Sequence, residues 1–229
     1  MSEDVRKMFA SISGRYDFLN SVLSLGIHHY WRRKTVQLTE ARPGMSVLDC
    51  ATGTGDLAIA YKKAVGEKGT VIGTDFCAEM LEPAPGKARK KKLEIYWEVA
   101  DAMNLPYDDY RFDISSIAFG IRNVDDPVVA LTEMARVVKP GGKVVVLEFG
   151  QPRGFMKYPF AWHSKYVIPL LGGWLGGNKK AYQYLPETSA AFPAGDRFIG
   201  LMKKTGQFKS FKSKPLMQGI AYIYQGVVL

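Results

Sequence analysis

The chain has 229 residues, of which 47% are hydrophobic and 23% charged, and its net charge is +9, which fits one domain with an appendage and a preference for anionic partners. The sequence contains no nucleic-acid-reading motif, no apolar run of roughly 18 or more residues and no signal peptide in its opening "MSEDVRKMF", so we expect a cytoplasmic protein that binds no nucleic acid. Its only cysteines, Cys50 and Cys77, are too few for a disulfide framework and lack the spacing of zinc ligands, so we expect buried thiols and no metal.

Residues 1–44 are predicted to form a helical cap ahead of the first strand. Within it, "YDFLNSVLSLGIHHYW" (16–31) places polar and aromatic groups at helical spacing. We expect one set of its side chains to pack and another to face a pocket: Leu19, Val22, Leu23, Leu25 and Trp31 in the first set, and Tyr16, Asp17, Asn20 and His28 in the second. Neighbouring helical residues point about 100° apart, so His29 is expected to point away from His28 and not to form a metal pair with it.

From residue 45, short apolar runs alternate with helical patterns, as in a doubly wound α/β sheet with helices on both faces. The predicted strands are 45–50, 69–76, 93–101, 112–120 and 143–150, and two closing strands lie within 208–229. The predicted helices are 57–65, 127–138 and 194–206. "KPGG" (139–142) is predicted to form the turn between the second of these helices and the strand that follows it. The result is a seven-stranded, mostly parallel sheet with a core at 45–150 and a C-terminal part at 196–229. The aromatic insertion 151–195 is expected to be helical and to cover the carboxyl edge of the sheet, where such sheets bind ligands.

A glycine turn follows the first predicted strand. In "VLDCATGTGDLA", Gly53 and Gly55 stand between a strand and a helix, where missing side chains let a ligand approach the N–H groups at the helix N-terminus. Asp75 lies about twenty residues further on, at the end of the second strand, where its carboxylate can accept hydrogen bonds from both ribose hydroxyls of a nucleoside. The combination predicts an adenosine-containing cofactor.

Two cofactors fit this turn, because "GTGDLA" also satisfies the dinucleotide pattern when Ala58 replaces the last glycine. S-adenosylmethionine is favoured over NAD because Asp49 ends the first strand, where a carboxylate suits an ammonium group and repels a pyrophosphate. A long helical segment before that strand favours it too, as do Asp101 and Ala102, which are placed to hold the adenine. Asp101 alternatively serves as a turn or cap residue, and an NAD-dependent oxidoreductase stays open as another class.

Several motifs carry a family resemblance. "VLDCATGTGD", "GTDF", "ADAMNLPY" and "RVVKPGG" resemble those of class I S-adenosylmethionine-dependent methyltransferases. With "YDFLNSVLSLGIHHYW", "FGIRNVDDP" and "RVVKPGGKVVVLEF", the chain is similar over almost its whole length to the ubiquinone/menaquinone biosynthesis C-methyltransferase family (UbiE/MenG). The resemblance implies C-methylation of a prenylated quinol, with demethylmenaquinol ahead of a ubiquinone precursor and S-adenosylhomocysteine as coproduct. It leaves open another hydrophobic phenol or polyketide as substrate, and a noncatalytic subunit of a quinone-biosynthesis complex.

The resemblance also implies the cofactor contacts, which fall on Thr54, on Asp75 with Phe76 beside it, and on Asp101 and Ala102. Two positions depart from the family: Ala118 stands where a serine contact is usual, and Gly150 replaces the serine of "LEFS". In "MLEPAPGKARKKK", Pro83 and Pro85 are expected to interrupt a helix that the family would make regular.

The expected chemistry needs a proton acceptor and a cation, because a quinol carbon becomes nucleophilic when a neighbouring hydroxyl, with a pKa on the order of 10, loses its proton. The predicted catalytic residues are His28, Arg122, Asn123 and Tyr16. His28 is the candidate base, Arg122 the cation for the oxyanion, and Asn123 the group that orients a hydroxyl or a water. The alternatives are a structural hydrogen bond for His28, an ion pair with Asp125 or Asp126 for Arg122, and a helix cap for Asp17.

The aromatic insertion predicts a mouth that faces a membrane and admits an isoprenoid tail. Its aromatic residues are Phe155, Tyr158, Phe160, Trp162, Tyr166 and Trp174, and its lysines Lys157, Lys165, Lys179 and Lys180 are suited to anionic head groups. We therefore expect peripheral association with the inner face of the cell membrane. Core packing and homodimer contact are the alternatives, and His163 is assigned no role beyond an interfacial or core histidine.

Overall fold

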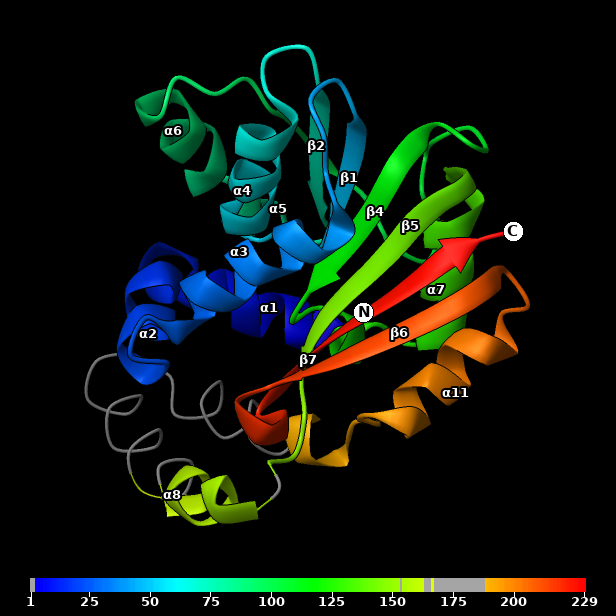
Figure 1. Ribbon diagram of the computed structural model, residues 1–229. Coiled ribbons are helices and arrows are strands. Elements are labelled where there is room, and N and C mark those ends of the chain that lie inside the picture. Colours follow the sequence, from blue (N-terminus) through cyan, green and yellow to red (C-terminus); the bar gives the residue numbers. More distant parts are fainter. Residues whose placement is uncertain (1–2, 153, 163–165, 167–187) are drawn as a thin grey trace.

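One seven-stranded sheet organises the chain (Figure 1). The computed structural model describes residues 3–152, 154–162, 166 and 188–229. Its strands are β1 (Ser46–Cys50), β2 (Thr70–Asp75), β3 (Tyr96–Val99), β4 (Phe112–Ala118), β5 (Val138–Phe149), β6 (Phe208–Leu216) and β7 (Ala221–Val228), in the order β3-β2-β1-β4-β5-β7-β6. Strands β1 to β5 are parallel, and β7 runs antiparallel between β5 and β6. The predicted α/β class and the mostly parallel, doubly wound sheet are confirmed.

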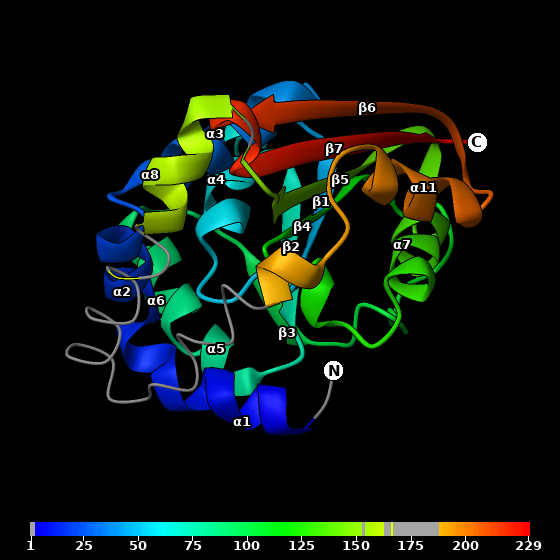
Figure 2. The ribbon, with the colours of Figure 1, turned by 90° about the horizontal axis from the view of Figure 1, so that it is seen from below.

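Helices cover both faces of the sheet, as Figure 2 shows. The helices α3 (Ile27–Thr39) and α4 (Asp56–Val65) pack on one face, and α7 (Pro127–Arg136) and α11 (Asp196–Lys204) on the other. Successive strand residues point to opposite faces, so Val47 packs with α4 whereas Leu48 packs in the cluster that contains α7 and α11. Apolar side chains therefore fill both sides of each central strand, which explains the continuous apolar runs in the sequence.

The N-terminal cap is helical as predicted. It comprises α1 (Glu3–Ile12), the 3-10 turn η1 (Ser13–Arg15), α2 (Tyr16–Leu23) and α3. Trp31 is buried in the sheet-facing cluster as expected, but the prediction that Leu25 packs is wrong, since its side chain is 80% exposed. Leu25 has φ +50 in the turn between α2 and α3, and this turn directs its side chain to solvent. The side chains of Leu19 and Leu23 lie outside the described residues.

Two local predictions are modified by the structure. The "KPGG" segment belongs to β5 rather than to a free turn, and the pairing register with β4 shifts there while Gly141 takes φ +80. A bulge within β5 therefore stands where the sequence predicted a turn between a helix and a strand. The proline-containing segment forms two short helices, α5 (Ala78–Leu81) and α6 (Pro83–Lys90), with Pro83 at the start of the second. The predicted interruption is confirmed at Pro83, whereas Pro85 lies within α6 and does not interrupt it.

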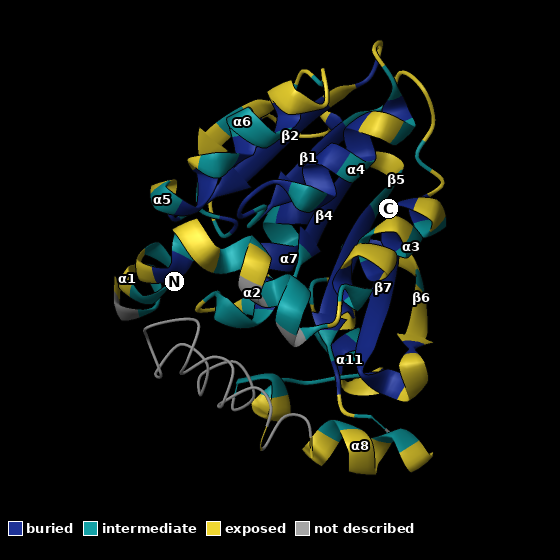
Figure 3. Cartoon of the chain, turned by 90° about the vertical axis from the view of Figure 1, so that its left-hand side faces the viewer, coloured by how far each residue is buried: buried dark blue, intermediate teal, exposed yellow. Residues whose placement is uncertain are grey.

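The insertion is described only in part. The 3-10 turn η3 (Gly154–Met156) and α8 (Lys157–Trp162) lie at the edge of the molecule, where Figure 3 shows α8 carrying mostly exposed residues. The predictions for His163, Lys165, Trp174, Lys179 and Lys180 lie outside the described residues. Within the residues that are described, no helix combines the length and apolar character needed to cross a membrane.

Candidate active site

Two cavities open at the carboxyl edge of the sheet. The smaller, of about 70 Å³, is lined by predicted site residues from the ends of four strands: Gly53, Asp75, Phe76, Asp101, Ala102, Ala118 and Asn123. The larger has a volume of about 920 Å³. Tyr16 and Phe119 line both cavities, so a group held in one lies next to a group held in the other.

Asp75 is fixed at the end of β2 by two backbone hydrogen bonds. Its Oδ2 accepts from the N–H of Gly53 at 2.8 Å, and its Oδ1 accepts from the N–H of Cys77 at 2.9 Å. Burial raises the pKa of this carboxyl to about 6, and the two donors offset part of that cost. Each carboxylate oxygen retains a further lone pair, so the group fits a ribose diol.

The glycine turn leaves room only for backbone. Gly53 has φ +57, and a Cβ there would lie 3.3 Å from Cε of Met80; Gly55 has φ +84, and a Cβ there would lie 2.5 Å from the ring of Trp97. Ala51 also adopts a positive φ of +46. The turn therefore depends on small residues for both conformation and space, and it fits the close backbone approach that an adenosyl cofactor requires.

Other predicted cofactor residues make contacts within the protein. Asp49 is buried and accepts hydrogen bonds from the hydroxyls of Thr52 and Ser116, and burial raises the pKa of its carboxyl to about 6. Asp101 lines the smaller cavity and also accepts from the N–H of Met103 at 2.9 Å, so it acts as a turn residue as well. In the described part of the chain, neither cavity is lined by Asp49, Thr54 or Gly55.

Thr54 belongs to a charged cluster that joins the cap to the glycine turn. Its hydroxyl donates to Asp17, and Lys87 donates to Thr54 at 3.1 Å, to Asp17 at 2.6 Å and to Asp56 at 2.5 Å. Asp17 therefore turns toward α4 and α6 rather than capping α2 by a side-chain hydrogen bond. The cluster ties α2 to the first turn of α4, directly after the glycine turn.

Arg122 forms a buried ion pair behind the larger cavity, which it lines. In the 3-10 turn η2 (Ile121–Asn123), its Nη1 donates to Glu148 Oε1 at 2.6 Å and to the carbonyl of Phe119 at 2.7 Å. The exposed fractions of the two charged side chains are 4% and 1%, and burial raises the pKa of the Glu148 carboxyl while Arg122 opposes that shift. Of the alternative partners Asp125 and Asp126, Asp126 caps α7 through Oδ1, and the ion pair described for Arg122 is instead the one with Glu148.

His28 is buried, and both of its ring nitrogens are engaged. Nδ1 accepts a hydrogen bond from Nη1 of Arg32, which leaves the ring proton on Nε2, 3.3 Å from the hydroxyl of Ser21. Burial, reinforced by the charges of Arg32 and His29, lowers the pKa of His28 to about 3. The ring is therefore neutral near pH 7, and its contacts favour the structural alternative over that of a base.

His29 does not point away from His28, so that prediction is wrong. The ring centroids lie 3.9 Å apart, because long side chains on neighbouring residues converge through their own torsions even when their Cβ atoms diverge. Among the residues described, ligand-type atoms of His28, His29 and Asp56 fall within 4.8 Å of one another. Arg32 and Lys87 contact this group, and such cations oppose metal binding; the absence of a metal stays a prediction.

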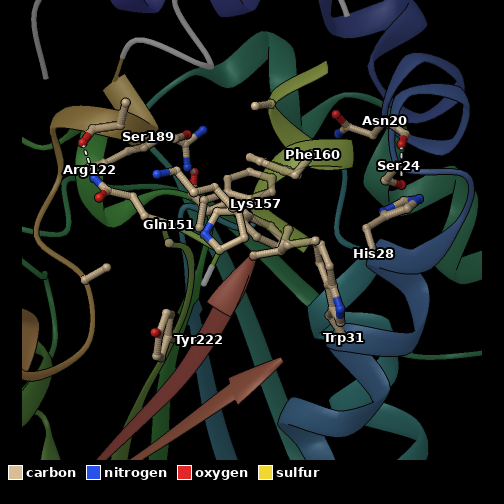
Figure 4. A pocket seen from close by; sticks show the side chains of 18 of the residues that line it. Asn20, Ser24, His28, Trp31, Arg122, Gln151, Lys157, Phe160, Ser189 and Tyr222 are labelled. Carbon is tan, nitrogen blue, oxygen red and sulfur yellow. Dashed lines mark hydrogen bonds between the residues drawn. The ribbon is translucent and has the colours of Figure 1, made fainter. Parts of the chain in front are cut away.

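The larger cavity has an aromatic floor between two arginines. The rings of Phe119 and Phe149 lie 4.5 Å apart, with the guanidinium of Arg32 at 5.9 Å from the first and that of Arg122 at 5.4 Å from the second. Figure 4 shows His28 and Trp31 of α3 on one side of the cavity, and Arg122 and Gln151 on the other. Tyr16, Asn20 and His28 line it as predicted.

Sequence reasoning missed three residues of this site. Arg32 lies four residues after His28, a spacing at which helical side chains meet, so this contact had a signal in the sequence. Phe119 stands at φ +57, a conformation that bulky residues seldom adopt and that often marks functional sites. Glu148 was visible only as a polar residue at the end of an apolar strand.

The sheet order, the glycine turn and the carboxylate at the end of β2 define the fold of the class I S-adenosylmethionine-dependent methyltransferases. The chain is similar to the structure of such a methyltransferase from Thermotoga maritima, with a TM-score of 0.68 and 20% identity over 96% of this chain and 98% of that one. A methyltransferase from Aquifex aeolicus gives a TM-score of 0.63 and 19% identity over 86% and 89%. At sequence identities of 19% and 20%, the structural similarity shows that the chain shares the fold of these two proteins.

Sequence comparison shows the family. Residues 1–228 match the ubiE/COQ5 methyltransferase family, and the chain is 55% identical to "Ubiquinone/menaquinone biosynthesis C-methyltransferase UbiE" of Bdellovibrio bacteriovorus, over 99% of this chain and 96% of that protein. It is 44% identical to "Demethylmenaquinone methyltransferase" of Deinococcus radiodurans, over 97% and 91%. The chain belongs to the ubiE/COQ5 methyltransferase family, and it is an S-adenosylmethionine-dependent methyltransferase. The predicted family, enzyme class and methyl donor are confirmed.

Proposed function

We propose that this enzyme methylates a ring carbon of a prenylated quinol in quinone biosynthesis, with demethylmenaquinol as the first candidate and a ubiquinone precursor as the second. The observation that carries the proposal is the pair of cavities that share Tyr16 and Phe119. The smaller one is lined by Asp75, Asp101 and Asn123, whose side chains can bind an adenosyl group, and the larger one, with its aromatic lining, lies beside it. The names of the relatives from Bdellovibrio and Deinococcus agree with this substrate class.

The size and lining of the larger cavity suit a bicyclic ring that carries part of an isoprenoid tail. Its volume of about 920 Å³ lies at the upper end of the roughly 300 to 1,000 Å³ found for small-molecule sites. Trp31, Phe119, Phe149, Phe160 and Tyr222 contribute aromatic surface to it, and such surface offers apolar area to a planar ring. A small polar substrate would leave most of this surface without a partner.

The charges around the cavity support an anionic form of the substrate. Four of its lining residues are cationic and one is anionic: Arg32, Arg122, Lys157 and Arg197 against Asp196. When bound, S-adenosylmethionine supplies an electrophilic methyl group. The protein's contribution is to align the ring, exclude water and stabilise the phenolate, and fixed positive charge close to the ionised oxygen is effective at the last of these.

The other predicted catalytic residues, Tyr16, Asn123 and His28, are assigned supporting roles. Tyr16, at the junction of the cavities, closes the site and offers a hydroxyl to a ring oxygen. Asn123 lines the cofactor cavity, which suits an amide that orients a polar group there. His28 holds a neighbouring side chain through its ring nitrogens instead of removing the proton from the quinol, because a group with a pKa near 3 is a poor acceptor for a phenolic proton.

We further propose that α8 docks on an anionic membrane and admits the tail. Lys157, Phe160 and Ala161 line the larger cavity, whereas Tyr158 and Trp162 of the same helix are 76% and 61% exposed. An exposed aromatic face beside a lysine suits the interfacial region of a bilayer. Co-sedimentation with vesicles that contain phosphatidylglycerol should fall when Tyr158 and Trp162 become serine, whereas loss of a dimer in ultracentrifugation without loss of vesicle binding would favour a homodimer contact.

The substrate proposal is tested by methyl transfer from labelled S-adenosylmethionine to demethylmenaquinol, to a demethylated ubiquinol precursor, and to the oxidised form of each. We expect label in the reduced substrates and much less in the oxidised ones, because only the reduced ring can ionise to a phenolate. Equal labelling of oxidised and reduced rings would refute the phenolate mechanism. A phenol without a prenyl tail is included in the same assay, and labelling of that phenol alone would replace the proposed substrate class.

A further inference from the structure

Arg32 stands at the wall of the larger cavity in a position that the sequence did not signal as catalytic. It is on α3, its side chain is 12% exposed, and it lines the cavity. Its Nη1 donates to Nδ1 of His28 and lies 3.7 Å from Oδ2 of Asp56, while its guanidinium stands 5.9 Å from the ring of Phe119. The side chain is thus held from three sides.

The contacts of this guanidinium leave donors for a ligand. A guanidinium carries five N–H groups, and in the described part of the chain its hydrogen bond and its ion pair both use Nη1. The other N–H groups belong to a side chain that lines the cavity. Planar, forked donors of this kind match an oxygen anion in geometry as well as charge.

Arg32 is also the less neutralised of the two arginines that flank the aromatic floor. Arg122 is bonded to Glu148 at 2.6 Å, so its charge is largely compensated. The carboxylate nearest to Arg32 is that of Asp56 at 3.7 Å, and Asp56 is shared with Lys87 at 2.5 Å. Coulomb interaction weakens with distance, so the positive charge of Arg32 is less compensated than that of Arg122.

We propose that Arg32 is the residue that binds the ionised ring oxygen of the substrate, and that His28 is the positioning residue that aims it. The inference rests on the proposed function and names the cation of that site. Binding next to Arg32 favours loss of the hydroxyl proton to solvent water, with the electron pair kept on the oxygen. Only a neutral His28 can accept the hydrogen bond from Arg32. Burial of the ring favours this neutral form.

The surroundings support a pair that keeps its charge state through the physiological range. The titratable and charged groups that act on it are His29 on α3, Asp56 on α4, Lys87 on α6 and Asp49 at the end of β1, and Asp17 on α2 is bonded to Lys87. The cations among them disfavour a second positive charge on His28, and burial acts in the same direction.

The test uses a coloured anion that needs no methyl transfer. The probe is 4-nitrophenol, a phenol that ionises near neutral pH and whose visible absorbance reports its ionisation, and nitrobenzene serves as the neutral analogue. We expect the full-length protein to lower the pKa of the bound probe by about one unit or more, as a nearby opposite charge does. In Arg32→Gln this shift should disappear and anion binding should weaken about tenfold, with neutral binding unchanged. Arg33→Gln, an exposed arginine on the same helix, is the matched control.

Two further variants test the positioning role and separate it from a folding defect. His28→Phe should lose most of the shift in the probe's pKa, whereas His28→Asn should regain part of it because its amide oxygen accepts from Arg32. S-adenosylmethionine binding shows that each variant is folded. Anion binding by Arg32→Gln equal to that of Arg33→Gln would overturn the inference, and equal losses in His28→Phe and His28→Asn would overturn the positioning role.

The outcome for Arg32 is distinguishable from that for the substrate proposal. A protein that binds the anion through Arg32 but methylates no prenylated quinol would refute the proposed function and support the anion site. A protein that methylates the quinol, with a probe shift that Arg32→Gln leaves unchanged, would refute the inference alone.

Discussion

The buried pair of Arg122 and Glu148 makes a sharp prediction about stability. The exposed fractions of the two side chains are 4% and 1%, and one hydrogen bond of 2.6 Å joins them, while Nε of Arg122 and Oε2 of Glu148 have no partner among the described residues. Arg122→Gln leaves a carboxylate buried without its cation. Removing one partner of a buried ion pair costs roughly 3 to 5 kcal/mol, so we expect a loss of this size in the free energy of unfolding at pH 8.

The pH dependence of that loss follows from the direction of the pKa shift. Burial raises the pKa of Glu148 and Arg122 opposes this, so the variant has a higher Glu148 pKa than the wild type. A carboxyl whose pKa is raised by folding binds more protons in the folded state, and its contribution to stability is therefore lost as pH rises through the folded-state value. The deficit of Arg122→Gln should be largest at pH 8 and should shrink toward pH 5.

Urea unfolding of wild type and variant across this pH range measures the effect. Lys139→Gln is the control, because its ion pair with Asp113 is exposed and such pairs contribute about 0 to 1 kcal/mol. A deficit for Arg122→Gln below about 1 kcal/mol at pH 8, as small as that of a surface pair, would contradict the buried arrangement. A deficit that does not change with pH would contradict the assignment of the pH effect to Glu148.

Three other predictions follow from the site. Asp75→Asn should weaken S-adenosylmethionine binding in calorimetry by roughly 1 to 3 kcal/mol through lost ribose hydrogen bonds, and an unchanged Kd would refute that role. Lys87→Met removes the cation shared by Asp17 and Asp56, so amide exchange in α2 should accelerate while that in β1 stays the same; equal rates in α2 would show that the ion pairs do not hold the cap. Treatment with EDTA should leave methyl transfer unchanged, because cations already contact the group of two histidines and Asp56; a loss restored by a divalent metal would contradict the expectation of no metal.

The fold was predictable because it depends on patterns that repeat along the chain. Apolar runs on both faces of β1 and β5 require helices on both sides of the sheet, and the glycine turn marks the first strand-to-helix crossing. The elements that escaped prediction are governed by single backbone angles. Leu25 and Phe119 both adopt positive φ, and apolar residues give no sequence signal for that conformation.

The site was predictable where the chemistry depends on residues close in sequence, and not where it depends on partners from distant elements. Asp75 lines the smaller cavity beside Gly53, as the strand-and-turn spacing indicated. Arg122 was predicted to be the cation for the oxyanion, with an ion pair to a neighbouring loop aspartate as the alternative, but neither prediction included its buried partner Glu148 on β5. The contact of Thr54 with the cofactor stays a prediction, but its partners Asp17 and Lys87, which come from α2 and α6, had no signal in the sequence. Such long-range polar contacts follow from packing, which a single sequence does not encode locally.

The central claim is that the methyl group becomes bonded to a ring carbon of a prenylated quinol. The most direct measurement is carbon NMR of the product formed from demethylmenaquinol and S-adenosylmethionine labelled with ¹³C in its methyl group. The account predicts one labelled resonance in the region of methyl groups on an aromatic carbon, and its absence when the oxidised quinone replaces the quinol. A labelled resonance in the methoxy region would show transfer to oxygen and would contradict the claim.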